Sequence, residues 1–173
     1  MGKPPVVATI AELRTALAPH RAGAIAMVPT MGALHAGHLS LIAAAGAPVV
    51  VVSIFVNPAQ FAPHEDFDAY PRNLDGDLAT LAAMASPSRI IVFAPGAGEI
   101  YPQGFATSIS VGGPSAGLES DFRPHFFAGV ATVVAKLLLA AMPDSAVFGE
   151  KDYQQLLVVR RLAADLGLAT RIV

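Results

Sequence analysis

Residues 49–56 read V-V-V-V-S-I-F-V, and this run of mostly β-branched residues decides the fold. β-Branched side chains favour strands, and a strand that is apolar at successive positions is buried on both faces, as in a parallel sheet covered by helices. The stretch from Leu39 to Val56 carries no charge and is nominally long enough to span a bilayer. Gly46 and Pro48 divide it, so we interpret it as a short helix followed by a buried strand.

Similar segments alternate along the rest of the chain. Thr9 and Glu12 have the spacing of a capping box, which predicts a helix that starts there and ends before Pro19. We expect strands at 24–29, 49–56, 89–94, 146–149 and 169–173, and further helices at 38–46, 75–85, 126–141 and 152–166, with Gly167 as a C-cap. This order predicts an α/β domain with a doubly wound parallel sheet and helices on both faces. A short additional strand is possible at 106–111.

Composition narrows the range of functions. There is no cysteine, which excludes disulfides and Cys-based metal sites and suits a cytoplasmic location. The net charge of −2 and the scattered Lys and Arg residues argue against a nucleic-acid binder. No signal peptide is recognisable at the N-terminus. The chain is 54% hydrophobic and only 14% charged, so we expect a second domain or a partner subunit to cover part of its surface.

Polar residues and glycines follow four of the predicted strands. In an open parallel sheet, ligands bind beyond the carboxyl ends of the strands, so these segments are the candidate site. They are P-T-M-G at 29–32, N-P-A-Q-F at 57–61, P-G-A-G-E at 95–99 and G-E-K-D at 149–152. We expect all four to meet in one crevice, where glycines, amides, imidazoles and a lysine would suit a phosphorylated ligand.

His35 and His38 lie where a turn opens a helix, and three interpretations are open for them. The helix start favours an anion, to which both imidazoles could donate, and Gly37 would let the backbone approach a phosphate. A metal site would need a third ligand from elsewhere in the chain. Capping or core packing is the third interpretation. The neighbouring strand ends favour the phosphate site.

The other polar residues have both structural and ligand-binding interpretations. Asn57 and Gln60 suit hydroxyls and carboxylate oxygens, although loop hydrogen bonds beside Pro58 would also explain them. Lys151 opposes the dipole of the helix that it precedes, which a phosphate ligand would explain, whereas a solvated charge cluster is the alternative. The acidic stretch comprises Glu65, Asp66, Asp68, Asp75 and Asp77. Most of these residues are interpreted as solvated or capping, but one could serve a magnesium ion carried with a nucleotide, because that ion needs only one or two protein carboxylates.

Five motifs together closely resemble the pantothenate synthetase (pantoate-β-alanine ligase) family of the nucleotidyltransferase superfamily. They are V-P-T-M-G-A-L-H-A-G-H, S-I-F-V-N-P-A-Q-F, D-A-Y-P-R, R-P-x-F with F-A-G-V-A-T-V-V-A-K-L, and F-G-E-K-D-Y-Q-Q-L. The resemblance covers essentially the whole chain. It implies a Rossmann-like fold and a two-step reaction, in which pantoate is adenylated by ATP with release of pyrophosphate and β-alanine then displaces AMP to give pantothenate.

The resemblance also implies roles for individual residues. His38, His35 and Lys151 would be catalytic, and Gln60, Gln155 and Asn57 would bind substrate. The ATP site would comprise Met31, Gly32, Ala33, Leu34, His35, Ala36, Gly37 and His38 with Gly149, Glu150, Lys151 and Asp152. Magnesium would accompany ATP, and we assign it to Asp77, although Gly76 stands where some relatives have an acidic residue.

Family members continue past the position of Val173 into a loop that closes on ATP and a smaller C-terminal domain. Residues 1–173 would therefore be the nucleotide- and pantoate-binding domain, without that smaller domain. The family is dimeric, which suits the apolar surface, and we expect a homodimer that binds neither nucleic acid nor membrane. Two other interpretations stay open: another nucleotidyltransferase, and a catalytically incomplete nucleotide-binding or dimerisation fragment.

Overall fold

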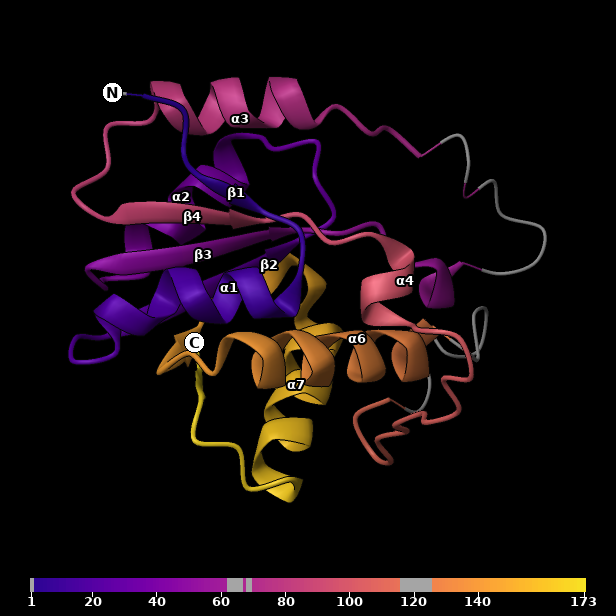
Figure 1. The fold of residues 1–173 in the computed structure, drawn as a ribbon. Helices are drawn as coiled ribbons and strands as arrows, with labels where there is room; N and C mark the ends of the chain where they lie inside the picture. The colour runs from indigo at the N-terminus through magenta and orange to yellow at the C-terminus, as the bar shows by residue number, and fades with distance from the viewer. Residues whose placement is uncertain (1, 62–66, 68–69, 116–125) are drawn as a thin grey trace.

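A computed structural model describes residues 2–61, 67, 70–115 and 126–173, and it contains a six-stranded parallel sheet (Figure 1). The strands lie in the order β1-β4-β3-β2-β5-β6. Their bounds are β1 Val6–Val7, β2 Ile25–Thr30, β3 Val49–Ile54, β4 Arg89–Phe93, β5 Ser145–Ala146 and β6 Arg171–Ile172. Residues 116–125, which include Arg123 and His125 of the R-P-x-F motif, lie outside the described part, as do Glu65, Asp66 and Asp68 of the acidic stretch.

Six α-helices and three short 3-10 helices connect the described strands. The α-helices are α1 Ile10–Leu17, α2 Ala36–Ala44, α3 Leu74–Ala83, α4 Ala97–Ile100, α6 Phe126–Ala141 and α7 Tyr153–Asp165. The 3-10 helices are η1 Ala18–His20, η2 Pro58–Gln60 and η3 Glu150–Asp152. The predicted capping box starts α1, because the Thr9 side chain accepts the Glu12 N–H and the Glu12 carboxylate accepts the Thr9 N–H.

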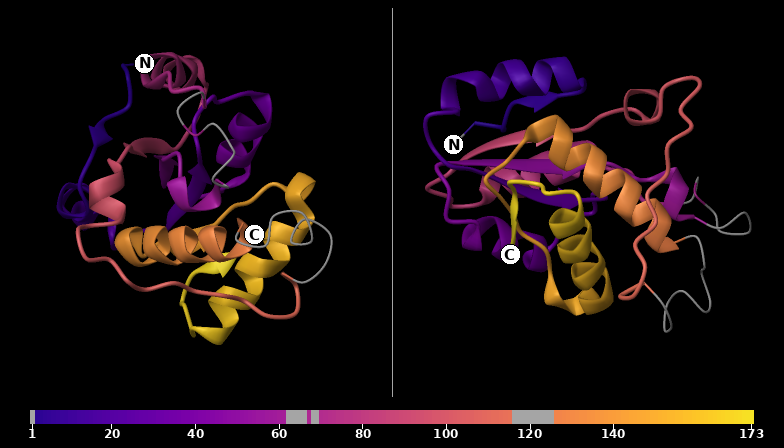
Figure 2. Two further views of the ribbon diagram at one scale, coloured as in Figure 1. Left: turned by 90° about the vertical axis from the view of Figure 1, so that its right-hand side faces the viewer. Right: turned by 90° about the horizontal axis from the view of Figure 1, so that it is seen from below.

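The central strands are buried on both faces, which confirms the doubly wound, Rossmann-like arrangement. Alternate residues of one strand belong to different cores: Val49 and Val51 pack with α1, α6 and α7, whereas Val50 and Val52 pack with α2 and α3. The left view of Figure 2, which looks toward the carboxyl ends of the strands, has α6 and α7 on one side and α2 and α3 on the other. Among the described residues, no helix combines the length and apolar character needed to cross a bilayer.

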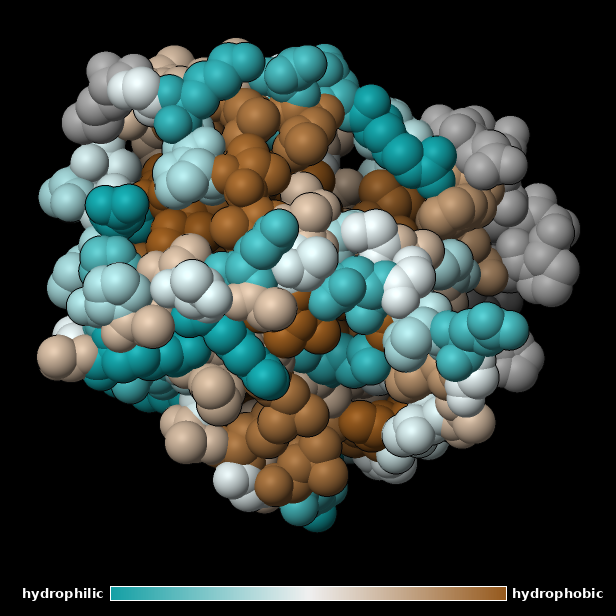
Figure 3. Space-filling model, in the orientation of Figure 1, coloured by the Kyte–Doolittle hydropathy of each residue, from teal (hydrophilic) through white to brown (hydrophobic). Residues whose placement is uncertain are grey.

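The structure corrects two details of the predicted order. Residues 106–111 form no strand: the Ile109 N–H donates to the Thr132 hydroxyl at 2.9 Å, so this segment packs along α6 and does not join the sheet. The short strand β1 was not predicted, and it pairs with β4 at one edge of the sheet. Figure 3 shows apolar residues exposed at several separate places on the face that it draws. Large apolar residues that are exposed in the described chain include Leu139, Met142 and Leu166.

Candidate functional site

A cavity of about 490 Å³ opens beyond the carboxyl ends of β2, β3 and β5. Its polar lining comes from segments that follow three different strands, which places side chains far apart in sequence around one space. Most of the predicted site residues line it, and these are Met31, His35, Gly37, His38, Gln60, Gly149, Glu150, Lys151, Asp152 and Gln155. Ala33, Leu34, Ala36 and Asn57 do not line the cavity.

The turn from Met31 to Leu34 leads from β2 into α2, and hydrogen bonds hold it from both ends. The Thr30 hydroxyl donates to the Ser53 carbonyl at 2.7 Å and accepts the Gly32 N–H at 3.2 Å. The Asp77 carboxylate, only 5% exposed, accepts the N–H of Ala33 at 3.1 Å and that of Leu34 at 2.7 Å. A carboxylate that satisfies two consecutive backbone donors fixes the path of the chain there.

This turn also contains two residues in the left-handed backbone region. Gly32 has φ 86° and Ala33 has φ 51°. A side chain at position 32 would be strained by that φ, and its Cβ would also lie 2.9 Å from Asp77 Oδ2. Ala33 adopts a conformation that non-glycine residues rarely take, and its N–H is one of the two held by Asp77. The carboxylate therefore holds the strained part of the turn.

His35 and His38 are held by backbone groups in a way that sets their tautomers. His35 caps α2, where its Nδ1 accepts the Gly37 N–H at 3.1 Å, and His38 Nδ1 accepts the His35 N–H at 3.4 Å. The two ring centroids lie 4.1 Å apart. Because a nitrogen that accepts a hydrogen bond carries no proton, the ring hydrogen of each imidazole is on Nε2. Each histidine of the cavity lining therefore has an Nε2–H donor.

Burial lowers the pKa of His38 below its ordinary value of 6.5, and the neighbouring His35 lowers it further, whereas Asp77 raises it. His38 is therefore neutral at pH 7, which agrees with its role as an acceptor at Nδ1 and a donor at Nε2. Gly37 also has a structural reason, which leaves its predicted role beside a phosphate as a prediction. A Cβ at this position would lie 2.9 Å from His35 Cε1, so the glycine makes room for the capping imidazole.

Gln60 lies on η2 and lines the cavity, whereas Asn57 is buried behind it. Asn57 is 1% exposed, and its Nδ2 donates to Gln60 Oε1 at 2.9 Å and to the Gly129 carbonyl at 3.2 Å. A Cβ on Gly129 would lie 2.3 Å from the Ala59 carbonyl oxygen, so the glycine allows α6 to approach η2. The structure thus corrects the predicted direct contact of Asn57 with substrate: its side chain is engaged within the protein.

The G-E-K-D segment follows β5, which pairs with β2 on the side away from β3. Gly149 precedes η3, which contains Glu150, Lys151 and Asp152, and α7 follows directly. Lys151 and Asp152 are exposed side chains that line the cavity, and Gln155 reaches it from the first turn of α7. The predicted position of the lysine just before a helix is confirmed.

An apolar stripe of α6 forms a part of the cavity wall that the sequence analysis did not identify. Val130, Val133, Val134 and Leu137 recur at helical spacing on one side of α6, and all four line the cavity. Their sequence pattern indicates only a buried helix, because Thr132 and Lys136 are the only polar residues among the sixteen of α6. Gly129 is a sequence signal that α6 packs closely against another segment, but only the structure shows that this segment is η2.

The prediction that four strand ends share one crevice is wrong for the segment that follows β4. That segment, from Ala94 to Ala97, lines a separate cavity of about 370 Å³. Gly32 and Asp77 line this second cavity, and Met31 and Phe55 are the described residues that line both. Glu99, at the end of the predicted motif, accepts the Ile10 N–H at 2.8 Å and so connects α4 to α1.

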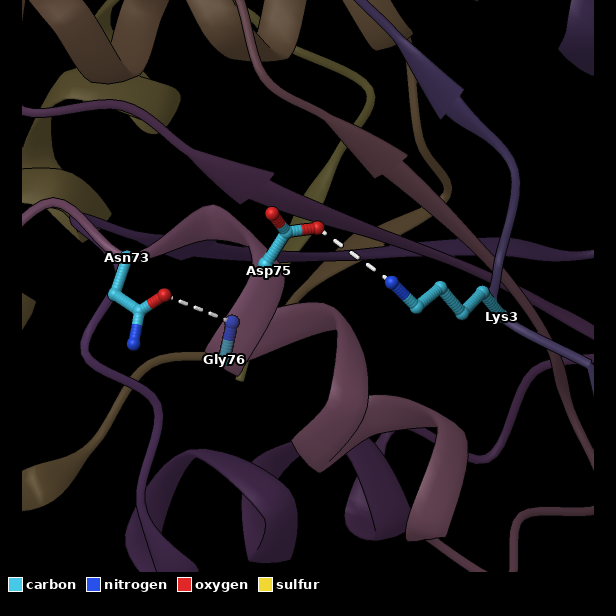
Figure 4. A network of polar contacts seen from close by, with 4 residues as sticks. All are labelled: Lys3, Asn73, Asp75 and Gly76. Carbon is cyan, nitrogen blue, oxygen red and sulfur yellow. Dashed lines mark hydrogen bonds and ion pairs between the residues drawn. The ribbon is translucent and has the colours of Figure 1, made fainter.

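The described part of the acidic stretch has structural contacts of its own at the start of α3 (Figure 4). Lys3 pairs with Asp75 at 3.5 Å, and Asn73 caps the helix by accepting the Gly76 N–H at 3.0 Å. A Cβ on Gly76 would lie 2.5 Å from Asn73 Nδ2, so a side chain at this position would require the capping amide to shift. Among the described residues, no group of three His, Cys, Asp or Glu side chains could hold a metal ion. The assignment of magnesium to Asp77 stays a prediction.

Comparison with known proteins extends this description. Residues 5–173 match a family described as Pantoate-beta-alanine ligase. A pantothenate synthetase from Mesorhizobium japonicum is 61% identical over the whole chain, which covers 62% of that relative. The crystal structure of pantothenate synthetase from Thermus thermophilus matches with a TM-score of 0.90 at 52% identity, over 98% of this chain and 60% of that one.

A third similar protein has been solved with ligands. It is the pantoate-beta-alanine ligase from Francisella tularensis complexed with beta-gamma ATP and beta-alanine, with a TM-score of 0.91 and 37% identity, over 98% of this chain and 66% of that one. The present chain spans about 60% of the length of the curated relatives that it matches.

Proposed function

The chain belongs to the pantoate-β-alanine ligase family, and we propose that it supplies the ATP- and pantoate-binding part of an enzyme that makes pantothenate. The observation that carries this proposal is one cavity that combines two imidazole donors and a lysine with two glutamines and an apolar wall. The first set suits the phosphates of ATP. The second set suits pantoate, which has a carboxylate, two hydroxyls and a pair of methyl groups.

In the proposed first step, a carboxylate oxygen of pantoate attacks the α-phosphorus of ATP, and the bond from that phosphorus to pyrophosphate breaks. Negative charge develops on the phosphoryl oxygens, so fixed donors stabilise this transition state. We propose that His38 and His35 donate through Nε2 and that Lys151 neutralises charge. The nucleophile belongs to the substrate, so no Ser, Cys or Asp nucleophile is needed.

In the proposed second step, the amine of β-alanine attacks the acyl carbon of pantoyl adenylate, and AMP leaves with the electron pair of the broken bond while the amine loses a proton. Gln60 and Gln155 would hold the pantoyl group throughout, and Gln60 would also place β-alanine. The support for Gln60 is its fixed position on η2, and that for Gln155 is its position in the first turn of α7, where both side chains line the cavity.

The nucleotide would occupy the turn at 31–38 and the segment at 149–152, with Asp152 on the ribose. Magnesium would arrive with the ATP phosphates. Both Asp77 oxygens accept backbone N–H groups, so the metal assignment to this residue rests on the family resemblance alone. The proposal also includes a homodimer in the cytoplasm, which rests on the family resemblance and, for the location, on the absence of cysteine.

Pyrophosphate release from ATP tests the proposal. It would be measured with and without pantoate and β-alanine, on this chain and on a chimera that adds the remaining part of the Mesorhizobium japonicum relative. We expect the chimera to release pyrophosphate only with pantoate and to form pantothenate when β-alanine is added. Pantoate binding to the shorter chain would be measured by calorimetry.

The outcomes separate the competing interpretations. If neither protein releases pyrophosphate and neither binds pantoate, the proposal is wrong. Release that depends on another alcohol or acid would indicate a different nucleotidyltransferase. Binding of ATP and pantoate without turnover by the shorter chain, alongside an active chimera, would identify residues 1–173 as the binding part of the enzyme.

A further inference from the structure

Tyr101, Asn57 and Gln60 form a chain of side-chain hydrogen bonds behind the cavity wall. The Tyr101 hydroxyl donates to Asn57 Oδ1 at 2.7 Å, and Asn57 Nδ2 donates to Gln60 Oε1 at 2.9 Å. Gln60 lines the cavity, Asn57 is 1% exposed, and Tyr101 lies directly after α4. None of the five sequence motifs contains Tyr101, so its connection to the site is visible only in three dimensions.

Two backbone groups fix the direction of this chain. The Ala59 N–H can only donate, and it lies 3.3 Å from one end of the Asn57 amide, which must therefore be Oδ1. The Gly129 carbonyl can only accept, and it lies 3.2 Å from the other end, which must be Nδ2. Since Nδ2 donates, the Gln60 atom that faces it is the acceptor Oε1. Gln60 consequently has its nitrogen, a donor, on the side away from Asn57.

We propose that Tyr101 is a positioning residue, which acts through Asn57 to hold the Gln60 amide with its nitrogen presented to the ligand. A donor at this point favours ligand oxygens that accept, such as a carboxylate or a hydroxyl, and disfavours a ligand that presents an N–H. The proposal rests on the proposed function in one respect: the ligand expected beside Gln60 is pantoate.

The surroundings of Tyr101 support this role. Its ring packs against Phe105, with centroids 5.1 Å apart, and lies near Phe55, with centroids 6.3 Å apart. Its backbone N–H donates to the Ala97 carbonyl at 2.7 Å, which fixes the residue at the end of α4. Burial raises the pKa of Tyr101 to about 12, so the hydroxyl stays protonated and able to donate at neutral pH. The hydroxyl is thus a fixed donor on the acceptor atom of Asn57.

The test compares Tyr101→Phe, which removes only the hydroxyl, with Tyr153→Phe, which removes an exposed hydroxyl from a tyrosine that is 56% exposed. Pantoate and ATP binding would be measured separately by calorimetry, and the Gln60 side-chain amide would be followed by ¹⁵N NMR without ligand. We expect Tyr101→Phe to weaken pantoate binding by up to about fivefold, the worth of the one hydrogen bond to the ligand that a misoriented Gln60 would lose, while ATP binding changes less than about twofold. The Gln60 amide signals should shift only in this variant.

A second variant tests the direction of the amide. Gln60→Glu keeps an acceptor for Asn57 but replaces the presented donor with a charged acceptor, so pantoate binding should fall further than in Tyr101→Phe. Unchanged pantoate binding in Gln60→Glu would overturn the assigned direction. Unmoved Gln60 signals in Tyr101→Phe, or equal loss of ATP and pantoate binding together with a lower Tm, would overturn the positioning role.

The NMR measurement also separates this inference from the proposed function. If the unaltered chain does not bind pantoate, the proposed function fails, but the response of the Gln60 amide to loss of the Tyr101 hydroxyl still decides whether Tyr101 positions it. If pantoate binds and the Gln60 signals do not respond, the positioning role alone is wrong.

Discussion

Asp77→Asn should destabilise the protein, because this carboxylate holds the turn between β2 and α2. The substitution keeps the size of the side chain and removes its charge. Both oxygens of the carboxylate accept backbone N–H groups, at 3.1 Å from Ala33 and 2.7 Å from Leu34. An asparagine has one oxygen and one NH₂ group, so it can accept only one of these bonds and must direct N–H groups against the other donor.

The expected magnitude follows from these two bonds. Hydrogen bonds to a charged group contribute about 1.5–3 kcal/mol each, whereas a neutral one contributes about 1 kcal/mol. Loss of one bond and weakening of the other should together lower the free energy of unfolding by roughly 2–4 kcal/mol. We expect the whole of this loss to be measured, because Asp77 is only 5% exposed and water cannot readily take the place of the lost acceptor oxygen.

Urea unfolding followed by circular dichroism at pH 7 would measure this effect. Asp75→Asn is the matched control, since the Asp75 side chain is 91% exposed and pairs with Lys3 at 3.5 Å. We expect the control to change the free energy of unfolding by less than about 0.5 kcal/mol. The reasoning is refuted if Asp77→Asn is no more destabilising than the control. If Asp77 instead serves mainly as a magnesium ligand, its substitution will alter the magnesium dependence of ATP binding with little effect on stability in the absence of the metal.

Three further predictions concern the cavity. Gly129→Ala should lower the free energy of unfolding by about 1–3 kcal/mol and weaken pantoate binding. The reason is that the new Cβ would lie 2.3 Å from the Ala59 carbonyl oxygen and displace Gln60. Urea unfolding would measure the stability, and calorimetry the binding. An NMR titration should give His38 a pKa below 6.5. Because the unfolded chain then takes up this proton at a higher pH than the folded one, the free energy of unfolding should fall as the pH drops through the window just below 6.5. His38→Gln should remove that part of the pH dependence. His38→Ala in the chimera should slow pyrophosphate release by an amount equivalent to about 2–4 kcal/mol, and an unaltered rate would remove His38 from the mechanism.

The fold could be predicted where burial leaves a periodic pattern. The run at 49–56 is apolar on both faces because two helical layers cover it, and the helix predicted at 126–141 has the bounds of α6. The two-residue strand β1 is too short to show any period. The alternation around Ile109 and Val111 resembles a strand, but the Thr132 hydroxyl takes the Ile109 N–H and holds the segment against α6. That competing partner lies 23 residues away in sequence.

The candidate site was predictable to a similar degree. His35, His38, Gln60 and Lys151 could be placed together because each follows a strand of one parallel sheet. What supports these residues could not be read from local patterns. Asp77 contacts a turn 43 and 44 residues earlier, and the hydroxyl that holds Asn57 comes from a tyrosine 44 residues later. Such contacts depend on how separate segments pack, and no spacing in the sequence records them.

The attachment of α1, and of Arg21 just after η1, to the end of α6 has a consequence for synthesis of the chain. The Arg14 guanidinium donates to the Leu139 and Ala140 carbonyls. The Arg21 guanidinium donates to the Ala141 and Met142 carbonyls. The bonded residues are 120 to 126 positions apart in the sequence. On a ribosome that adds about 5–20 residues per second, α1 emerges many seconds before its partners exist. The part of the apolar side of α1 that packs against α6 must therefore stay uncovered until α6 has left the exit tunnel, although the strands in the same core are made earlier. Contacts of such long sequence separation also slow refolding in vitro.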